Sequence, residues 1–419
     1  MSETSLPSNR ETKQRGLWRL FGPAFVAAVA YVDPGNVAAN LSAGAKYGYL
    51  LVWVLVLANI MAVIVQYLSA KLGIVTGRSL PEVLGDRMPR TSRLLYWAQA
   101  ELVAVATDLA EVVGGALALY LLFGTPLLLG GLIVGVVSLL ILALQHSGRG
   151  TTGQQRFEHV VIGLLAIITI GFVAGLFVAP PDWGEVVEGL VPRFADSGSV
   201  LLAASMLGAT VMPHAVYLHS SLARDRHGSS TEPGRIRRLL HANRWDVVLA
   251  LVVAGSVNIA MLLLAAASLR GVSGTDTIEG AAAAITTHLG AGIGIIFAIG
   301  LLASGLASTS VGAYAGAEIM SGLLHVKISL LARRLVTMVP ALVVLGLGVD
   351  PTWALVLSQV LLSFGIPFAI VPLVWLTSRK EVMGEFVNGV WLRLAGAVVA
   401  VLIIALNLLL IWLTLTGQA

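Results

Sequence analysis

The chain contains no cysteine and few charged residues, and each shortage excludes a class of protein. Without cysteine there is no disulfide, no thiolate metal site and no thiol redox centre. Charged side chains make up only 11% of the residues, whereas 57% are hydrophobic, and the mean hydropathy is +0.89. This composition excludes a soluble globular domain and indicates an integral membrane protein. A chain of 419 residues has room for about eleven or twelve spanning helices and little else.

Eleven hydrophobic segments can be recognised, and two of them contain helix-breaking residues. The residues before the first segment are polar and lack an apolar core with a cleavage site, so we expect no removable signal peptide. The segments lie at about 20–46 (broken), 51–74, 93–122, 125–145, 157–179, 198–223 (broken), 246–269, 291–320, 333–349, 351–376 and 390–414.

The basic residues are distributed as expected for a chain that crosses the membrane repeatedly. When the connections are assigned alternately to two sides, 23 of the 26 Lys and Arg residues fall on one side. The other side holds only Lys46, Arg193 and Arg270. The positive-inside rule then predicts a cytoplasmic N-terminus and, because eleven is odd, a C-terminus outside the cell membrane. The pI of about 9.5 therefore reflects topology and not nucleic-acid binding.

The first break is the run Asp33-Pro34-Gly35-Asn36. Pro34 has no backbone N–H and Gly35 adds conformational freedom, so we expect the helix to break within the bilayer and to leave carbonyls unpaired. A carboxylate beside such a break costs roughly 2.5 kcal/mol or more in hydrocarbon, and it usually marks an ion or substrate path.

The second break, Thr210-Val211-Met212-Pro213-His214, lies in the sixth segment. Segments one to five and six to ten thus form two sets, and because five is odd the second set enters from the opposite side. Such inverted repeats are typical of transporters and bring the two breaks together near the midplane. The predicted fold is all-α. The predicted parts are a cytoplasmic tail at 1–19, a first repeat at 20–179, an outer linker at 180–197, a second repeat at 198–376, and a loop with an accessory helix at 377–419.

The residues at the breaks offer several weak metal ligands. Asp33 supplies an anionic oxygen and Asn36 an amide carbonyl, and backbone carbonyls freed around Ala30 and Ala209 can add further oxygens. The oxygens alone would suit Mg²⁺, Ca²⁺ or Na⁺. Met212 favours a transition metal, because a thioether is a soft ligand. The alternative for Met212 is a lipid-facing position or simple packing in the core.

Further ionisable residues lie within the predicted spans. They are Glu101, Asp108, Glu111, His214, His219, Arg333 and Arg334. The three acids are seven and three residues apart, which places them on one stripe of the third helix. Each residue alone could belong to a structural ion pair, but three acids exceed what one pair needs. Chains of acids and histidines in membranes commonly relay protons, so we predict proton-coupled import of a divalent metal ion.

These motifs resemble those of the Nramp (natural resistance-associated macrophage protein) family of proton-coupled divalent metal transporters, in particular its bacterial manganese importers. The resemblance rests on the two break motifs and the acidic third helix, and extends from about Phe21 to Leu410. It implies a LeuT-type fold with no permanently bound cofactor. Mn²⁺ would be the principal substrate, with Fe²⁺, Co²⁺ and Cd²⁺ also accepted.

The resemblance also implies roles for individual residues. The implied metal ligands are the side chains of Asp33, Asn36 and Met212, the backbone carbonyls of Ala30 and Ala209 and, in some conformations, Gln359. An interhelical hydrogen bond is the alternative role for Gln359. The implied proton path comprises Asp33, His214, Glu101, Asp108, Glu111, Arg333 and Arg334. The implied partners are divalent metal ions, protons and the lipid bilayer, with the protein acting as a monomer.

Other functions fit the residues less well. A Na⁺-coupled amino-acid symporter of the same architecture would place a substrate carboxylate where Asp33 stands. A Mg²⁺ transporter would not need the sulfur of Met212. A membrane metalloprotease would need a pattern such as H-E-x-x-H, which the sequence lacks. A passive channel would not concentrate its ion. We therefore expect a secondary transporter and not an enzyme.

Overall fold

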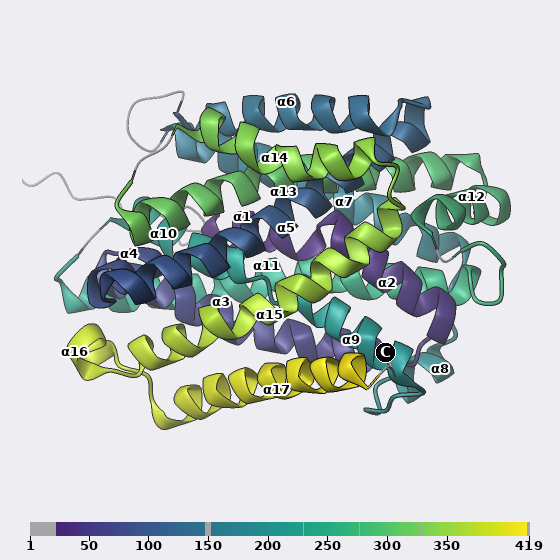
Figure 1. Ribbon diagram of the computed structural model, residues 1–419. Helices are drawn as coiled ribbons and strands as arrows, with labels where there is room; N and C mark the ends of the chain where they lie inside the picture. The colour runs from purple at the N-terminus through teal and green to yellow at the C-terminus, as the bar shows by residue number, and fades with distance from the viewer. Residues whose placement is uncertain (1–21, 147–151, 229, 276, 327–328, 417–419) are drawn as a thin grey trace, which may run out of the picture.

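The computed structural model describes residues 22–146, 152–228, 230–275, 277–326 and 329–416, and within these ranges the chain is helical without strands. The long helices run roughly parallel to one another in a single bundle (Figure 1). Their bounds are α1 Pro23–Val29, η2 Ala30–Val32, α2 Pro34–Tyr47, α3 Val52–Thr76, α4 Leu80–Arg87, α5 Arg90–Phe123, α6 Leu127–His146, α7 Thr152–Val178, α8 Trp183–Glu188, α9 Ser197–Thr210, α10 Pro213–His227, α11 Pro233–Ser268, α12 Ile278–Leu289, α13 Ala291–Leu324, α14 Leu330–Gly346, α15 Pro351–Thr377, α16 Lys380–Met383, η3 Gly384–Phe386 and α17 Val390–Leu415.

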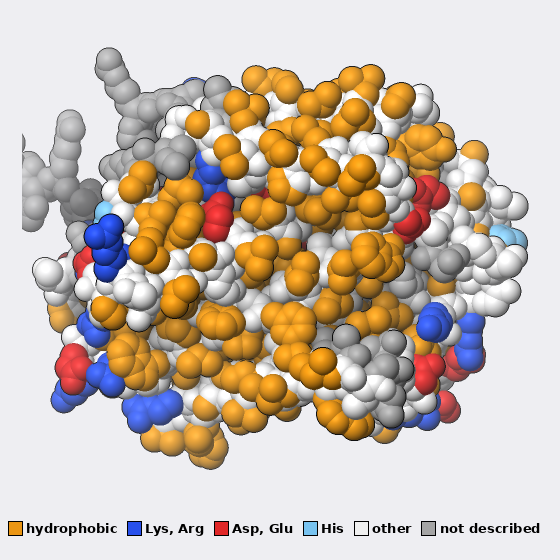
Figure 2. Space-filling view, in the orientation of Figure 1, with side chains coloured by type: hydrophobic (Ala, Val, Ile, Leu, Met, Phe, Trp, Pro, Cys, Tyr) orange, Lys and Arg blue, Asp and Glu red, His pale blue; other side chains and the backbone are white. Residues whose placement is uncertain are grey.

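Most of these helices suit a membrane. Within the described residues, nine spans are long and apolar enough to cross a bilayer, with α9 and α10 counted together as one. The segment Pro23–Val32 is apolar but shorter, and α14 has only 17 residues and contains two arginines, so the full count of eleven stays a prediction. Figure 2 shows hydrophobic side chains over the middle of one face, with most charged side chains toward its two ends. This distribution is typical of a protein surrounded by lipid.

The first helix breaks where the sequence predicts. Asp33 has an extended backbone (φ −72°, ψ 169°) and is the N-cap of α2, while Pro34 occupies the first helical position. Proline is well suited to that position, because the first turn of a helix has no partner for its N–H groups. The half-helices α1 and α2 are therefore separated by η2 and one extended residue.

The second break is similar in construction. α9 ends at Thr210, Val211 leaves the helical conformation (φ −105°, ψ 68°), and Met212 is the extended N-cap of α10. Pro213 begins α10 in the same way that Pro34 begins α2. Both predicted breaks are therefore present in the structure.

The predicted bounds are wrong at some connections. α11 begins at Pro233 and not near 246, so the basic residues Arg235, Arg237 and Arg238 lie on a helix and not in a loop. A helix that projects into water satisfies its own backbone and needs no apolar face, so hydropathy alone does not detect the extension. Short helices such as α4, α8 and α12 also occupy regions that we took as loops. The predicted tail at 1–19 lies outside the described residues.

α5 and α13 pack against each other and form much of the interior. α13 also packs against α7, and α11 packs against α2 and α3. The accessory helix α17 lies along the edge of the bundle beside α15 (Figure 1). Both breaks are consequently enclosed, and the residues at 30–43 and 208–223 are buried almost without exception.

Candidate metal site

The two breaks meet through Asn36. Its side-chain Nδ2 donates hydrogen bonds to Asp33 Oδ1 at 2.8 Å and to the backbone carbonyl of Ala209 at 2.9 Å. Its backbone N–H donates to the same Asp33 oxygen at 2.7 Å, which is the N-cap bond of α2. One amide therefore links the carboxylate of the first break to a carbonyl that precedes the second break.

Some side-chain oxygen atoms where the two breaks meet receive no hydrogen bond from the protein. Asp33, Asn36 and Gln359 are fully buried, with 0% of their surface exposed. Asn36 Oδ1 and Gln359 Oε1 have no hydrogen-bond donor among the described residues. A buried acceptor without a partner costs about 1–3 kcal/mol, so the arrangement is favourable only if another group satisfies these oxygens. A cation bound between these oxygens would do so.

Gln359 reaches the first break from α15. Its Nε2 donates to Asp33 Oδ2 at 3.4 Å, so in this conformation it makes the interhelical hydrogen bond that we considered as an alternative. The approach depends on two glycines. A Cβ added at Gly35 would lie 1.6 Å from Gln359 Nε2, and one added at Gly208 would lie 2.2 Å from the Gln359 backbone oxygen. Both half-helices α2 and α9 thus touch α15 only because they lack side chains there.

Met212 is fully buried in the main hydrophobic core, to which Ala30 also belongs. Its side chain therefore does not face lipid, and its position as N-cap of α10 holds it at the second break. Among the described residues, no group of three or more His, Asp or Glu side chains is arranged to hold a metal ion. The ligand roles of Asp33, Asn36, Met212, Ala30 and Ala209 therefore stay predictions.

The acids of the third span lie on α5 and meet arginines from α14. Arg333 pairs with Glu101 and Arg334 with Asp108, each at 2.8 Å. Arg334 and Asp108 are both almost completely buried. The predicted stripe therefore exists, and two of its three acids are paired as the structural alternative proposed.

Glu111 is the third acid of the stripe and has a different environment. Its carboxylate is fully buried, and neither oxygen has a hydrogen-bond partner among the described residues. It lies against α13, where a Cβ added at Gly312 would come within 2.8 Å of Oε2. Nearby, His214 Nδ1 is 3.3 Å from Thr107 Oγ1, next to Asp108 in the chain. The structure thus places α10, the helix after the second break, beside the acidic stripe of α5.

A second buried polar chain went unrecognised in the sequence. His219 Nδ1 lies 2.7 Å from Gln66 Oε1, and Gln66 Nε2 donates to the Tyr31 hydroxyl at 2.5 Å. Asn258 Nδ2 donates to the Tyr31 carbonyl at 2.6 Å, which fixes the backbone two residues before Asp33. The available signal was the presence of amide side chains within otherwise apolar spans, where polar groups usually bind a neighbouring helix.

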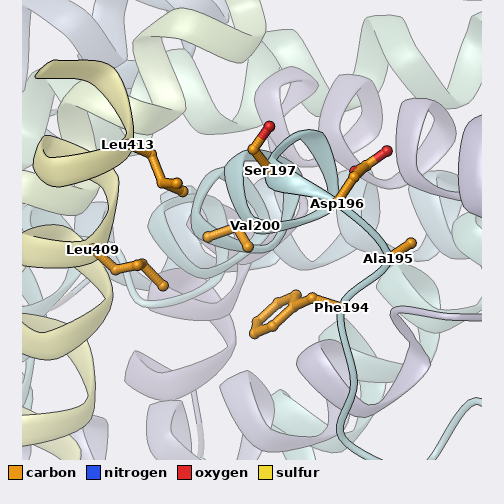
Figure 3. Close-up of a pocket in the computed structure, with 7 residues that line it drawn as sticks. All are labelled: Phe194, Ala195, Asp196, Ser197, Val200, Leu409 and Leu413. Carbon is orange, nitrogen blue, oxygen red and sulfur yellow. The ribbon is translucent and has the colours of Figure 1, made fainter. Parts of the chain in front are cut away.

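The hollows on the surface are separate from this buried site. One lies between the start of α9 and the end of α17, where Leu409 and Leu413 face Val200 and Phe194 (Figure 3). Asp196 points away from these apolar side chains in Figure 3. The Tyr47 hydroxyl hydrogen bond at 2.6 Å and the backbone N–H of Ser199 hold the pKa of the exposed Asp196 carboxyl below its ordinary value.

Comparison with known proteins gives the family. Residues 24–413 match the family model described as natural resistance-associated macrophage protein-like, Nramp. The chain belongs to the Nramp family. The divalent metal cation transporter MntH of Mycobacterium tuberculosis is 60% identical over 412 residues, covering 98% of this chain and 95% of the relative. MntH of Bacillus subtilis is 46% identical over 402 residues, covering 95% and 92%.

Solved structures agree with this assignment. The manganese transporter of Eremococcus coleocola superposes with a TM-score of 0.84 at 30% identity, covering 96% of this chain and 88% of that one. MhsT in complex with L-phenylalanine superposes with a TM-score of 0.59 at 16% identity over 92% of this chain and 98% of that one, which shows a shared fold alone. The predicted family and LeuT-type fold are confirmed, and the chain is a multi-pass membrane transporter of the Nramp family and not an enzyme.

Proposed function

We propose that this Nramp protein imports divalent transition-metal ions, Mn²⁺ foremost and Fe²⁺, Co²⁺ and Cd²⁺ in addition, together with protons. The relatives named as divalent metal cation transporters and as a manganese transporter support the substrate class. The observation that carries the proposal is the cluster of buried oxygens around Asp33, in which Asn36 Oδ1 and Gln359 Oε1 lack donors. Such acceptors suit a cation, and the adjacent buried Met212 favours a soft one.

The ligands in this proposal are the side chains of Asp33, Asn36 and Met212 with the carbonyls of Ala30 and Ala209, joined by Gln359 as α15 moves. A set with one carboxylate and otherwise neutral ligands holds an ion weakly, which suits a carrier that must also release it. Two positive charges that move inward across 100 mV gain about 4.6 kcal/mol, at ~2.3 kcal/mol for each charge. The membrane potential thus drives import even where the site is weak.

Protons would follow the stripe on α5. Asp33 exchanges a proton as the metal binds, and the proton passes by His214 toward Asp108, Glu111 and Glu101. Arg333 and Arg334 lie at the cytoplasmic end of this route. Their pairs with Glu101 and Asp108, at 2.8 Å each, support a continuous polar line beside the metal site. The metal leaves through a separate inner opening as the two repeats move relative to each other.

The residues of the site are sealed from solvent in this conformation, which corresponds to an occluded step of such a cycle. Opening to either side requires the half-helices to move away from α15 or from α11. The proposed arrangement also includes a cytoplasmic N-terminus, an outer C-terminus, the repeat bounds given above and a functional monomer.

Uptake into sealed proteoliposomes tests the proposal. The protein is offered Mn²⁺, Fe²⁺, Co²⁺, Cd²⁺, Mg²⁺ or Ca²⁺ while internal pH is recorded. We expect concentrative Mn²⁺ uptake with internal acidification, little uptake of Mg²⁺ or Ca²⁺, and no competition by amino acids. Uptake without a pH change would contradict proton coupling, and competition by amino acids would favour the symporter alternative.

The variant Asp33→Asn is the matched negative control. Asparagine is as good an N-cap as aspartate, so α2 should still begin at the same residue, but the only carboxylate of the site is lost. We expect Mn²⁺ uptake to disappear while the melting temperature in detergent stays near that of the wild type. Retained uptake would exclude Asp33 as a ligand.

A further inference from the structure

A groove on the outer surface of the bundle has no part in the metal site. It lies between α3, α11 and α17 and has a volume of about 630 Å³. Its walls are mostly apolar, and they include Ile64 and Tyr67 of α3, Val248 of α11 and Leu392 of α17. Two further side chains, Arg244 and Trp391, line the same groove.

The groove opens where a helix leaves hydrocarbon for water on the basic side of the protein. Arg244 is the last basic residue before residues 247–268 of α11, which contain no charged side chain. Trp391 is the second residue of α17, and 86% of its surface is exposed. Tryptophan and arginine at such positions mark the headgroup level of a bilayer. The groove therefore extends from the headgroups into the hydrocarbon.

Arg244 is the basic side chain that lines this groove, whereas one other basic residue on each of α3, α11 and α17 contacts another part of the protein. Arg237 pairs with Glu385 at 3.0 Å, Lys71 donates to Asn388 Oδ1 at 2.8 Å, and Arg393 donates to the Ser378 carbonyl. No acidic side chain of the described chain lies within ion-pair distance of Arg244. An arginine at the edge of hydrocarbon without a counter-charge is a favourable contact for an anion.

We propose that this groove binds one anionic phospholipid of the cytoplasmic leaflet. The phosphate contacts the Arg244 guanidinium, Trp391 lies beside the headgroup, and an acyl chain packs along the apolar wall formed by α3 and α17. Basic pockets between helices on the cytoplasmic side are known to hold such headgroups. The outer groove of Figure 3 serves as a contrast, because its lining residues include the acidic Asp196 and no basic side chain.

Lipid titration followed by native mass spectrometry tests this site. Full-length protein in detergent is titrated with phosphatidylglycerol or with phosphatidylcholine of the same chains, and bound lipids are counted. We expect one phosphatidylglycerol to bind more tightly than phosphatidylcholine. Arg244→Gln should weaken that binding about fivefold, which corresponds to ~1 kcal/mol for one basic residue near an anionic surface.

Two further variants and one competitor make the test specific. Arg238→Gln removes the same charge from an exposed position of α11 outside the groove and should leave binding unchanged. Ala395→Phe fills the apolar part of the groove and should weaken binding although Arg244 is intact. Equal binding of both lipids, equal losses in Arg244→Gln and Arg238→Gln, or displacement by soluble glycerol phosphate would each overturn the proposal.

Discussion

Met212 is the residue on which metal selectivity should depend. Met212→Leu keeps the volume of a fully buried side chain, and such exchanges usually cost less than about 1.5 kcal/mol, so the variant should fold. It removes the sulfur, and we expect Ca²⁺ and Mg²⁺ to compete with Mn²⁺ uptake much better than in the wild type. Met212→Ala should relax selectivity in the same direction. Competition assays with radioactive Mn²⁺ measure this effect.

The two variants also separate ligand chemistry from packing. If Met212→Leu keeps the discrimination between Mn²⁺ and Ca²⁺ and only Met212→Ala loses it, the side chain acts by its size. A soft-ligand role would then be wrong.

The buried pair of Arg334 and Asp108 could serve structure, proton movement or both. Removal of one partner leaves an uncompensated buried charge and typically costs about 3–5 kcal/mol, so Arg334→Gln alone should lower the melting temperature strongly. The double variant Asp108→Asn with Arg334→Gln has no net charge to compensate and should recover most of that stability. We expect the double variant to bind Mn²⁺ but to lose the acidification that accompanies uptake.

This comparison distinguishes the two roles directly. Recovery of both stability and proton uptake in the double variant would mean that the pair is purely structural. Glu101 and Arg333 are also paired at 2.8 Å but are less buried. A matched double variant at these two residues should lose less stability than the double variant at Asp108 and Arg334.

Between helices, the contact of α15 with the two breaks depends on glycine. Gly35→Ala would place a Cβ 1.6 Å from the side-chain Nε2 of Gln359, whereas Gly208→Ala would place one 2.2 Å from its backbone oxygen. Truncation by Gln359→Ala removes the first conflict but cannot remove the second. We therefore expect Gln359→Ala to restore the stability of Gly35→Ala and not that of Gly208→Ala, as measured by a double-mutant cycle of melting temperatures.

Melting temperatures of Gly35→Ala and Gly208→Ala equal to that of the wild type would show that the half-helices shift away from α15 without cost. In that case the interface would not hold the occluded conformation. Uptake rates of the same variants should follow the stability pattern, because α15 supplies Gln359 to the site.

The helix breaks were predictable because proline and glycine act locally. Pro34 and Pro213 each begin a half-helix, as their missing N–H and fixed φ require. The extension of α11 to Pro233 was not predictable from hydropathy, since a helix in water needs no apolar run.

The ion-pair partners of the acidic stripe on α5 could not be predicted from the spacing of the acids either. Spacing places Glu101 and Asp108 on one face, but only the packing of α14 against α5 decides that arginines cover them.

The same limit applies to the site as a whole. The motif residues Asp33, Asn36 and Met212 could be selected because carboxylate, amide and thioether are unusual together beside a break. The bond from Asn36 to the Ala209 carbonyl joins residues 173 positions apart, so no local pattern predicts it. Tyr31, Gln66 and Asn258 form their network across three different helices, and each is unremarkable in its own segment.

For the molecule as a whole, the proposed topology makes an unusually direct prediction. The chain has no cysteine, so a single introduced thiol is the only target for a membrane-impermeant maleimide. Glu232→Cys should be labelled only after permeabilisation, because it precedes α11 on the basic side, whereas Glu188→Cys at the end of α8 should be labelled in intact cells. Thr416→Cys, beyond α17, reports on the number of spans. With an odd number of spans, the residue at 416 lies outside, on the same side as Glu188, and should be labelled in intact cells. Labelling only after permeabilisation would mean an even number of spans and would contradict the eleven-helix topology.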